Sequence, residues 1–431
     1  MSNLTVVLFT RDLRLHDQPA LSAAAERGER VLPLFVLDDR LPATFGAPNR
    51  VAFLLDSLGD LRRSLEARGG GLAIRRGDVV AETVRLALDH GADAVHLSED
   101  VSAYAQERER RLGHALAGAH IELETFPGVT VVSPGELAPA GSDHFRVFTP
   151  YWRRWRSEPR RPVLAAPERI AAPTGVEWGE LPSREEIAAG RTAPELPPGG
   201  ETAGRRRLDE WLRDGLARYA VLRDDLAAAA TSGLSPYLHF GCVSAGEVVE
   251  RALSGDGEEF VRQLCWRDFH HQLLAANPGL TRDDLRPRGG GWRRDDEALD
   301  AWKAGRTGYP VVDAGMRQLL REGRMHNRAR LVAGSFLTKH LGIDWRLGAA
   351  HFFEHLVDGD VANNTGNWQW VAGTGADSRP YRMLSPHRQA ARFDTDGVYA
   401  RRYLPELGTP DYPDPIVDHE AAVARFRRAA A

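Results

Sequence analysis

The sequence has few cysteines, no excess of basic charge and no long hydrophobic run. Cys242 and Cys265 are the two cysteines of 431 residues, too few for a disulfide framework or a cysteine-based zinc site. A reducing, cytoplasmic compartment is therefore expected. The formal net charge is −4, so any nucleic acid would have to bind a local basic patch. No apolar run reaches the ~18 residues of a membrane span, and neither a membrane partner nor a signal peptide is expected.

The first 127 residues alternate short apolar runs with amphipathic stretches. This alternation predicts a Rossmann-like α/β domain, a doubly wound parallel sheet with a ligand crevice at the carboxyl ends of its strands. No GxGxxG fingerprint follows the first apolar run, so a dinucleotide site of that type is not expected here. The predicted strands are Val6–Phe9, Val31–Leu37, Leu72–Ile74, Ala94–Leu97 and Ile121–Phe126.

Two further regions follow. Residues 128–200 contain so many prolines that long helices are excluded, which predicts a connector with one short helix at Tyr151–Arg156. Residues 201–431 show helical periodicity and predict a larger all-α domain. The predicted helical stretches include Leu208–Ala229, Glu247–Leu253, Phe260–Ala276, Val311–Leu320 and Ala329–Leu341.

Polar and aromatic side chains that suit a flavin ring gather between Asp358 and Trp370. Two acids, two adjacent asparagines and two tryptophans fall in this short stretch. A carboxylate accepts a hydrogen bond from an imide N–H, an asparagine amide pairs with a ring nitrogen, and an indole stacks. The alternative interpretation is a polar loop followed by a core helix.

Two other features suit phosphate groups. The hydroxyls and backbone N–H groups of Thr231–Leu238, at a helix start, could bind a diphosphate, or could simply cap that helix. A basic face suits phosphate contacts beside a base-stacking pocket, or is a solvated surface. Provided that Gly323 does not interrupt the helix, this face comprises Arg317, Arg321, Arg324 and Arg328.

Ordered motifs along nearly the whole chain resemble those of the photolyase/cryptochrome family, most closely the bacterial class I cyclobutane pyrimidine dimer photolyases. They are Phe9–Asp17, Phe148–Trp152, Thr231–Leu238, Leu264–Phe269, Thr307–Pro310, Met325–Arg328 and Asp358–Trp370.

The resemblance implies that the helical domain holds FAD. Arg330 is then expected to pair with Asp358, and Asn364 to face the flavin N5 atom. Trp368, Trp345 and Trp292 match the family's tryptophan relay, although core packing is the commoner role of a tryptophan. The implied cofactor-binding residues are Tyr219, Thr231, Ser232, Gly233, Leu234, Ser235, Arg267, Arg330, Asp358, Gly359, Asp360 and Asn364.

The resemblance also implies the reaction. Reduced FAD, excited by blue or near-UV light, donates an electron to a flipped cyclobutane pyrimidine dimer and splits it, so no metal is expected. A second, light-harvesting pigment is implied near Asp38 and Asp100, with 8-hydroxy-deazaflavin favoured over methenyltetrahydrofolate. The implied partner is UV-damaged DNA, bound by a monomer. The expected substrate-binding residues are Arg223, Gln263, Trp266, Asn327, Arg328, Trp370, Arg382 and Gln389.

Several positions depart from the family pattern, mostly on the substrate side. Gln263 replaces a frequent glutamate, Leu331 a methionine, Arg324 an aromatic residue and Gly233 an arginine. Flavin photochemistry is therefore the firmer expectation, and the exact substrate remains open. The alternatives are repair of the 6-4 photoproduct, a cryptochrome-like photoreceptor, and a plain nucleotide-binding α/β protein.

Overall fold

A five-stranded parallel sheet forms the N-terminal part of the structure, a computed structural model that describes residues 4–26, 30–40, 46–287, 291–377 and 379–430. The strand order is β3-β2-β1-β4-β5, so the winding direction reverses at β1 and the sheet is doubly wound, as predicted. All five predicted strands are confirmed. They are β1 (Leu4–Phe9), β2 (Arg30–Asp38), β3 (Ala73–Gly77), β4 (Ala94–Ser98) and β5 (Glu122–Phe126).

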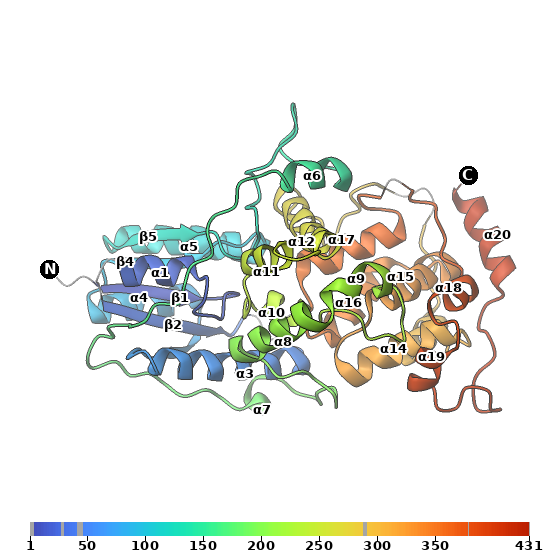
Figure 1. The fold of residues 1–431 in the computed structure, drawn as a ribbon, viewed down its shortest axis with the longest axis horizontal. Coiled ribbons are helices and arrows are strands. Elements are labelled where there is room, and N and C mark those ends of the chain that lie inside the picture. Colours follow the sequence, from blue (N-terminus) through green and yellow to red (C-terminus); the bar gives the residue numbers. More distant parts are fainter. Residues whose placement is uncertain (1–3, 27–29, 41–45, 288–290, 378, 431) are drawn as a thin grey trace.

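Helices cover both faces of this sheet (Figure 1). Side chains alternate along β1: Val7 and Phe9 join a core that extends into the helical domain, whereas Val6 and Leu8 join a core beneath α4 and α5. Both faces are therefore buried, which explains the nearly continuous apolar runs in the sequence. The helices of this part are α1 (Pro19–Glu26), α3 (Pro48–Glu66), α4 (Val79–His90) and α5 (Ala103–Gly118).

The connector crosses the surface with two short helices, α6 (Phe148–Trp155) and α7 (Arg184–Ile187). The predicted short helix is confirmed, but it begins three residues earlier, at Phe148, whose side chain is buried against the core. One buried carboxylate holds this segment: Asp268 Oδ2 accepts hydrogen bonds from the Val131 and Val132 backbone N–H groups and from Trp155 Nε1, at 3.0, 3.1 and 2.9 Å. Burial raises the pKa of Asp268 to about 6.

The remainder of the chain is helical (Figure 1). Apart from an isolated bridge between Arg293 and Ile343, the described residues after 200 form helices and loops. The domain boundaries at residues 127 and 200 stay a prediction. The helices are α8 (Glu201–Asp214), α9 (Leu216–Leu222), α10 (Ser235–His239), α11 (Ala245–Leu253), α12 (Glu258–Ala276), α13 (Asp296–Ala304), α14 (Pro310–Glu322), α15 (Asn327–Ser335), the π-helical turn η1 (Phe336–Leu341), α16 (Trp345–His355), α17 (Val361–Ala372), α18 (Pro386–Phe393), α19 (Val398–Tyr403) and α20 (His419–Ala430).

Two predictions about helices are wrong. The helical stretch at Leu208–Ala229 is divided at Gly215 and ends at Leu222. The basic helix face does not exist, because Gly323 adopts a left-handed conformation with φ of 65° and ends α14. Each of its four arginines instead has an acidic partner: Arg317 pairs with Glu406, Arg321 with Glu195, Arg324 with Glu322, and Arg328 with Asp224.

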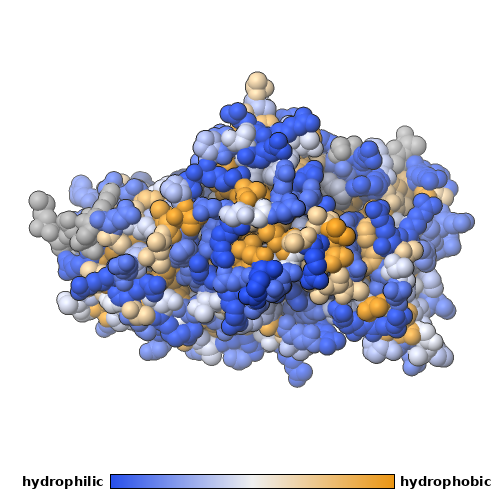
Figure 2. Space-filling view, viewed as in Figure 1, coloured by the Kyte–Doolittle hydropathy of each residue, from blue (hydrophilic) through white to orange (hydrophobic). Residues whose placement is uncertain are grey.

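The surface is mainly hydrophilic. In the space-filling view, hydrophobic residues gather near the middle of one face, and hydrophilic residues surround them (Figure 2). Among the residues that the structure describes, no helix has both the length and the apolar character that crossing a membrane requires.

Candidate active site

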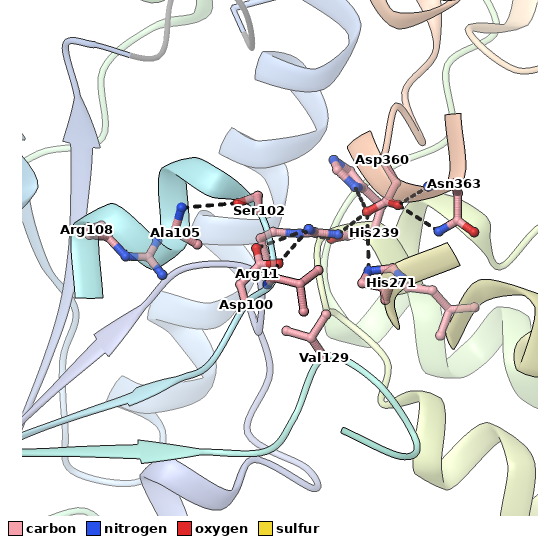
Figure 3. Close-up of polar contacts among 12 residues, drawn as sticks. Arg11, Asp100, Ser102, Ala105, Arg108, Val129, His239, His271, Asp360 and Asn363 are labelled. Carbon is pink, nitrogen blue, oxygen red and sulfur yellow. Dashed lines mark hydrogen bonds and ion pairs between the residues drawn. The ribbon is translucent and has the colours of Figure 1, made fainter. Parts of the chain in front are cut away.

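The carboxyl ends of the sheet strands face the helical domain, and Arg11 bridges the two (Figure 3). Arg11 follows β1 and Asp100 follows β4, so the fold brings them to the same edge of the sheet. The Arg11 guanidinium lies 3.2 Å from Asp100 Oδ2 through Nη1 and contacts Asp360 through Nη2. The residue that begins α17 is therefore tied directly to the sheet.

Asp360 is the centre of a buried polar cluster (Figure 3). It caps α17, because Oδ1 accepts from Asn363 N at 2.8 Å and from Asn363 Nδ2 at 2.7 Å. Oδ2 lies 3.8 Å from His239 Nδ1 and 3.7 Å from His271 Nε2. The sequence did not predict that Arg11, His239 and His271 lie here, although Arg11 belongs to the Phe9–Asp17 motif. A single histidine gives no signal in the sequence until the helices that surround it are packed.

The surroundings of this cluster fix the protonation states of Asp360 and His271. Burial opposes ionisation of Asp360, yet His271, Arg11 and His239 face the carboxyl and hold its pKa well below the usual range. Burial lowers the pKa of His271 to about 4, so its ring is neutral near pH 7. Near pH 7 the positive charge that stabilises the Asp360 carboxylate therefore comes from Arg11, which stays protonated.

The predicted pair between Arg330 and Asp358 is confirmed. Arg330 Nη2 lies 2.9 and 3.1 Å from the two carboxylate oxygens of Asp358. Burial opposes ionisation of Asp358, but Arg330 and a hydrogen bond from Ser235 lower its pKa. The loop at 231–235, α15 and the start of the 358–360 segment thus converge on one carboxylate.

The loop Thr231–Ser235 lies among positive charges. Arg207 on α8 donates to the carbonyl oxygens of Ser232 and Thr231, at 2.6 and 3.2 Å. Gly233 is left-handed with φ of 66°, and a Cβ atom added there would lie 3.3 Å from Arg207 Nε and 3.6 Å from Arg324 Nη1. Two guanidinium groups therefore lie beside the position at which many members of the resembled family carry arginine. This charge and the loop hydroxyls fit the diphosphate of FAD.

Several other predicted cofactor residues are held by hydrogen bonds or by packing. Arg267 donates to Val129 O at 2.6 Å and is close enough to Asp360 for their charges to interact. Asn364 donates to Ala349 O at 3.0 Å, which fixes its amide group. Tyr219 and Leu234 are buried in the core, and a Cβ atom on Gly359 would lie 2.8 Å from Arg50 Nη1. Their contacts with FAD stay predictions.

The three tryptophans of the predicted relay lie on connected elements. Trp368 and Trp345 are only 3% and 1% exposed, whereas Trp292 is half-buried. The Trp368 ring packs against Gly348 on α16, the helix that begins with Trp345. Next to Trp292, the Arg293 N–H donates to Gly342 O at 2.8 Å, just before that helix. Two of the three indoles are thus buried and the third is partly accessible, and their role as a relay stays a prediction.

The predicted substrate residues are only partly brought together. Trp266 on α12 stacks on Phe148, with ring centroids 3.6 Å apart, and Arg382 lies over Trp370 at 5.1 Å. The helices α12 and α17 pack against each other.

Some of the other predicted substrate-binding residues pair with acidic side chains or have buried polar atoms. Arg223 pairs with Glu259 at 2.7 Å, and Arg328 pairs with Asp224 at 2.8 Å. The buried Oε1 atom of Gln389 has no hydrogen-bond partner among the described residues. Gln263 is half-buried on α12 and Asn327 is exposed at the start of α15. DNA contacts by all of these residues stay predictions.

Both residues expected near a second pigment lie at strand ends. Asp38 is the last residue of β2 and accepts a hydrogen bond from Tyr104 Oη. Asp100 lies two residues beyond β4 and is engaged by Arg11. The predicted placement is confirmed, and the pigment itself stays a prediction.

Comparisons with known proteins agree with this geometry. Residues 5–171 match the family model described as DNA photolyase, and residues 260–411 match that described as the FAD binding domain of DNA photolyase. The chain is 50% identical to a deoxyribodipyrimidine photo-lyase of Streptomyces griseus, over 99% of each chain.

Solved structures share the whole fold. A bacterial class III photolyase from Agrobacterium tumefaciens superposes with a TM-score of 0.92 at 34% identity, covering 100% of this chain and 97% of that one. A cryptochrome from Synechocystis sp. also gives a TM-score of 0.92, at 29% identity, with 100% and 99% of the two chains covered. From its sequence, its fold and the arrangement of its polar and aromatic side chains, the chain belongs to the photolyase/cryptochrome family.

Proposed function

We propose that this protein is a light-dependent DNA repair enzyme, a deoxyribodipyrimidine photo-lyase that splits cyclobutane pyrimidine dimers. The observation that carries the proposal is the composition of α17. Asp360 and Asn364 lie at its start, the buried Trp368 lies one turn further, and Trp370 follows beneath Arg382. One helix would thus join the cofactor, the relay and the DNA.

Bound FAD, reduced and excited by blue or near-UV light, would supply the electron that opens the dimer. Two sets of groups in this chain would hold it. Ser235, with Arg207 and Arg324 beside the loop, provides hydroxyl and positive groups for the phosphates. Asp358 and Asp360 are fixed as carboxylates by arginines and are suited to accept hydrogen bonds from ring or ribose donors.

Aromatic faces compensate for the cost of extruding the lesion. Flipping a damaged pair costs a few kcal/mol, less than flipping an intact pair. Stacking returns ~1–3 kcal/mol per base, and we assign this role to Trp266 and Trp370. Arg382, 5.1 Å above the Trp370 ring, brings positive charge to the place where DNA phosphates would lie.

The tryptophan relay carries positive charge from the interior to the surface. Trp345 Nε1 donates to the Asp284 carboxylate at 2.9 Å, which stabilises positive charge on the indole. Arg346 lies over the same ring at 4.7 Å and opposes that charge. We expect the positive charge to move on to Trp292, because this half-buried indole is more accessible to water than Trp345.

A second pigment is part of the proposal. Asp38 and Asp100 lie at the strand ends where this fold binds ligands. We favour 8-hydroxy-deazaflavin over methenyltetrahydrofolate. A mass spectrum of the pigments extracted from purified protein identifies it, and folate in place of deazaflavin would contradict this choice.

The test of the function is loss of cyclobutane dimers from UV-irradiated oligo-thymidine under blue light. We expect loss in the light and none in the dark. Trp370→Ala should reduce repair at least tenfold because it removes a stacking face. Trp178→Ala removes a half-buried indole of the connector and serves as the control, for which repair should persist.

The same experiment separates the alternative function. If the bound pigment is photoreduced but dimers persist in the light, the protein is a cryptochrome-like photoreceptor. If 6-4 photoproducts disappear and cyclobutane dimers do not, the substrate is the 6-4 photoproduct. A UV-damaged DNA partner, a monomeric state and a cytoplasmic location stay predictions.

A further inference from the structure

The last turns of α16 carry three side chains of the kind that bind metal ions. His351, Glu354 and His355 are spaced i, i+3 and i+4, which places them on one face of the helix. One ligand atom from each lies within 4.8 Å of the others. Histidines at i and i+4 with an intervening glutamate form a recurrent zinc-binding arrangement on helices.

His351 supplies a second, independent observation. Its side chain is only 8% exposed, and the buried Nε2 atom has no hydrogen-bond partner among the residues that the structure describes. The ring lies 4.6 Å from that of His355 and 5.6 Å from that of Trp302, measured between centroids. A buried polar atom left unpaired costs ~1–3 kcal/mol, and a bond to a metal ion would remove this cost.

We propose that His351, Glu354 and His355 bind a divalent transition-metal ion of the zinc class. Two imidazole nitrogens and one carboxylate oxygen make a three-ligand set that leaves one position for water. Bonds of ~2.0–2.1 Å place neighbouring ligand atoms ~3.3 Å apart, so the side chains must close from their present spread of up to 4.8 Å. Glu354 is exposed and His355 half-buried, so these two can turn towards the fixed His351.

The local charges permit a cation. The site lies at the C-terminal end of α16, where the helix dipole favours positive charge. Two cations are close, Lys303 near His351 and Arg50 near His355. Both are already engaged: Arg50 donates to the carbonyl oxygens of Phe353 and Leu356, and Lys303 pairs with Asp300 at 3.6 Å. The Glu354 carboxylate adds a negative charge, which offsets the repulsion between these two cations and a bound metal ion.

The site lies next to the segment that is expected to bind FAD, because His355 and Asp358 are three residues apart. Asn49 on α3 donates to His355 O at 2.6 Å, so a bound ion would lie where α16 meets the α/β part of the molecule. The sequence predicted no metal, because the implied electron-transfer reaction needs none and no cysteine or histidine spacing typical of a metal site was identified. The H-x-x-E-H spacing is the signal that could have found it.

Calorimetric titration of the FAD-containing, EDTA-treated protein with Zn²⁺ alone tests the proposal. We expect one ion per chain. His355→Ala should weaken binding at least tenfold and Glu354→Gln by a smaller factor. Both residues reach the surface, so the fold should persist, which circular dichroism and flavin content verify. His114→Ala, an exposed histidine of α5, is the matched control and should bind as the unaltered protein does.

Electron paramagnetic resonance with Cu²⁺ in place of Zn²⁺ identifies the ligands. The unaltered protein should show hyperfine splitting from two imidazole nitrogens, reduced to one in His355→Ala. Absence of binding, or equal binding by His355→Ala and the unaltered protein, would overturn the proposal. Neither result depends on light or on DNA, so the metal site and the repair function can fail separately.

Discussion

At the scale of single residues, guanidinium groups organise the site. Arg11 holds Asp360, Arg330 holds Asp358, and Arg207 holds the loop that carries Thr231 and Ser232. Each arginine lies on a different element from its partner. Because an arginine remains charged and donates in several directions, it can fix a carboxylate or a loop before a cofactor binds.

Arg207→Ala should weaken FAD binding about tenfold, which corresponds to about 1.4 kcal/mol. The substitution removes two charge-assisted hydrogen bonds to the Ser232 and Thr231 carbonyl groups, on a side chain that is partly exposed. Flavin fluorescence released on dilution measures the affinity. Arg213→Ala, on the same helix but paired with the adjacent Asp214, is the control. Equal affinity of both variants would show that the loop needs no such support.

At the scale of elements, the close contact of α16 with α17 sets the position of the first relay tryptophan. A Cβ atom on Gly348 would lie 2.6 Å from Trp368 Cζ3 and 2.5 Å from Leu337 Cδ2. Only a glycine lets the two helices approach so closely around this indole.

Gly348→Ala should therefore destabilise the protein by about 1–3 kcal/mol, the usual cost of overpacking. Thermal unfolding monitored by circular dichroism gives the change in midpoint temperature. Gly118→Ala is the control, since it lies at the end of α5 and a Cβ atom there would meet nothing within 4 Å. A Gly348→Ala variant as stable as the Gly118→Ala variant would contradict the packing described.

At the scale of the whole molecule, Asp17 joins three segments. Its carboxylate accepts from Arg161 and from the Leu164 N–H of the connector, and from Ser244, which caps α11. The side chain is completely buried. Burial opposes its ionisation, but hydrogen bonds from Arg161, Ser244 and Leu164 outweigh this and lower the pKa of Asp17.

Asp17→Asn should cost about 2–4 kcal/mol of unfolding free energy near pH 7, because it leaves Arg161 without its charged partner. Asparagine tolerates the left-handed backbone at this position, with φ of 54°, so the charge alone is tested. Since the folded pKa lies below the unfolded value of 3.8, this stabilisation is complete above about pH 5 and disappears as the pH falls through the folded pKa.

Denaturant titrations at pH 7 and near pH 3 measure this difference. The gap between the unaltered protein and Asp17→Asn should narrow in acid, whereas the exposed Asp411→Asn should differ little at either pH. A gap of the same size at both pH values would mean that Asp17 is not the charged link between these segments.

Local patterns in the sequence determined the parallel sheet, the proline-rich connector, the helical second half and the segments that carry the cofactor side chains. Strand and helix periodicity depends on neighbours in the chain, and so does a motif such as Asp358–Trp370. Tertiary structure alone decided the break of the basic face at Gly323, the place of His239 and His271, and the contact of Arg11 with Asp360, 349 residues away. Side chains so far apart meet only when separate elements pack, and the packing energy that joins them is not a property of either segment.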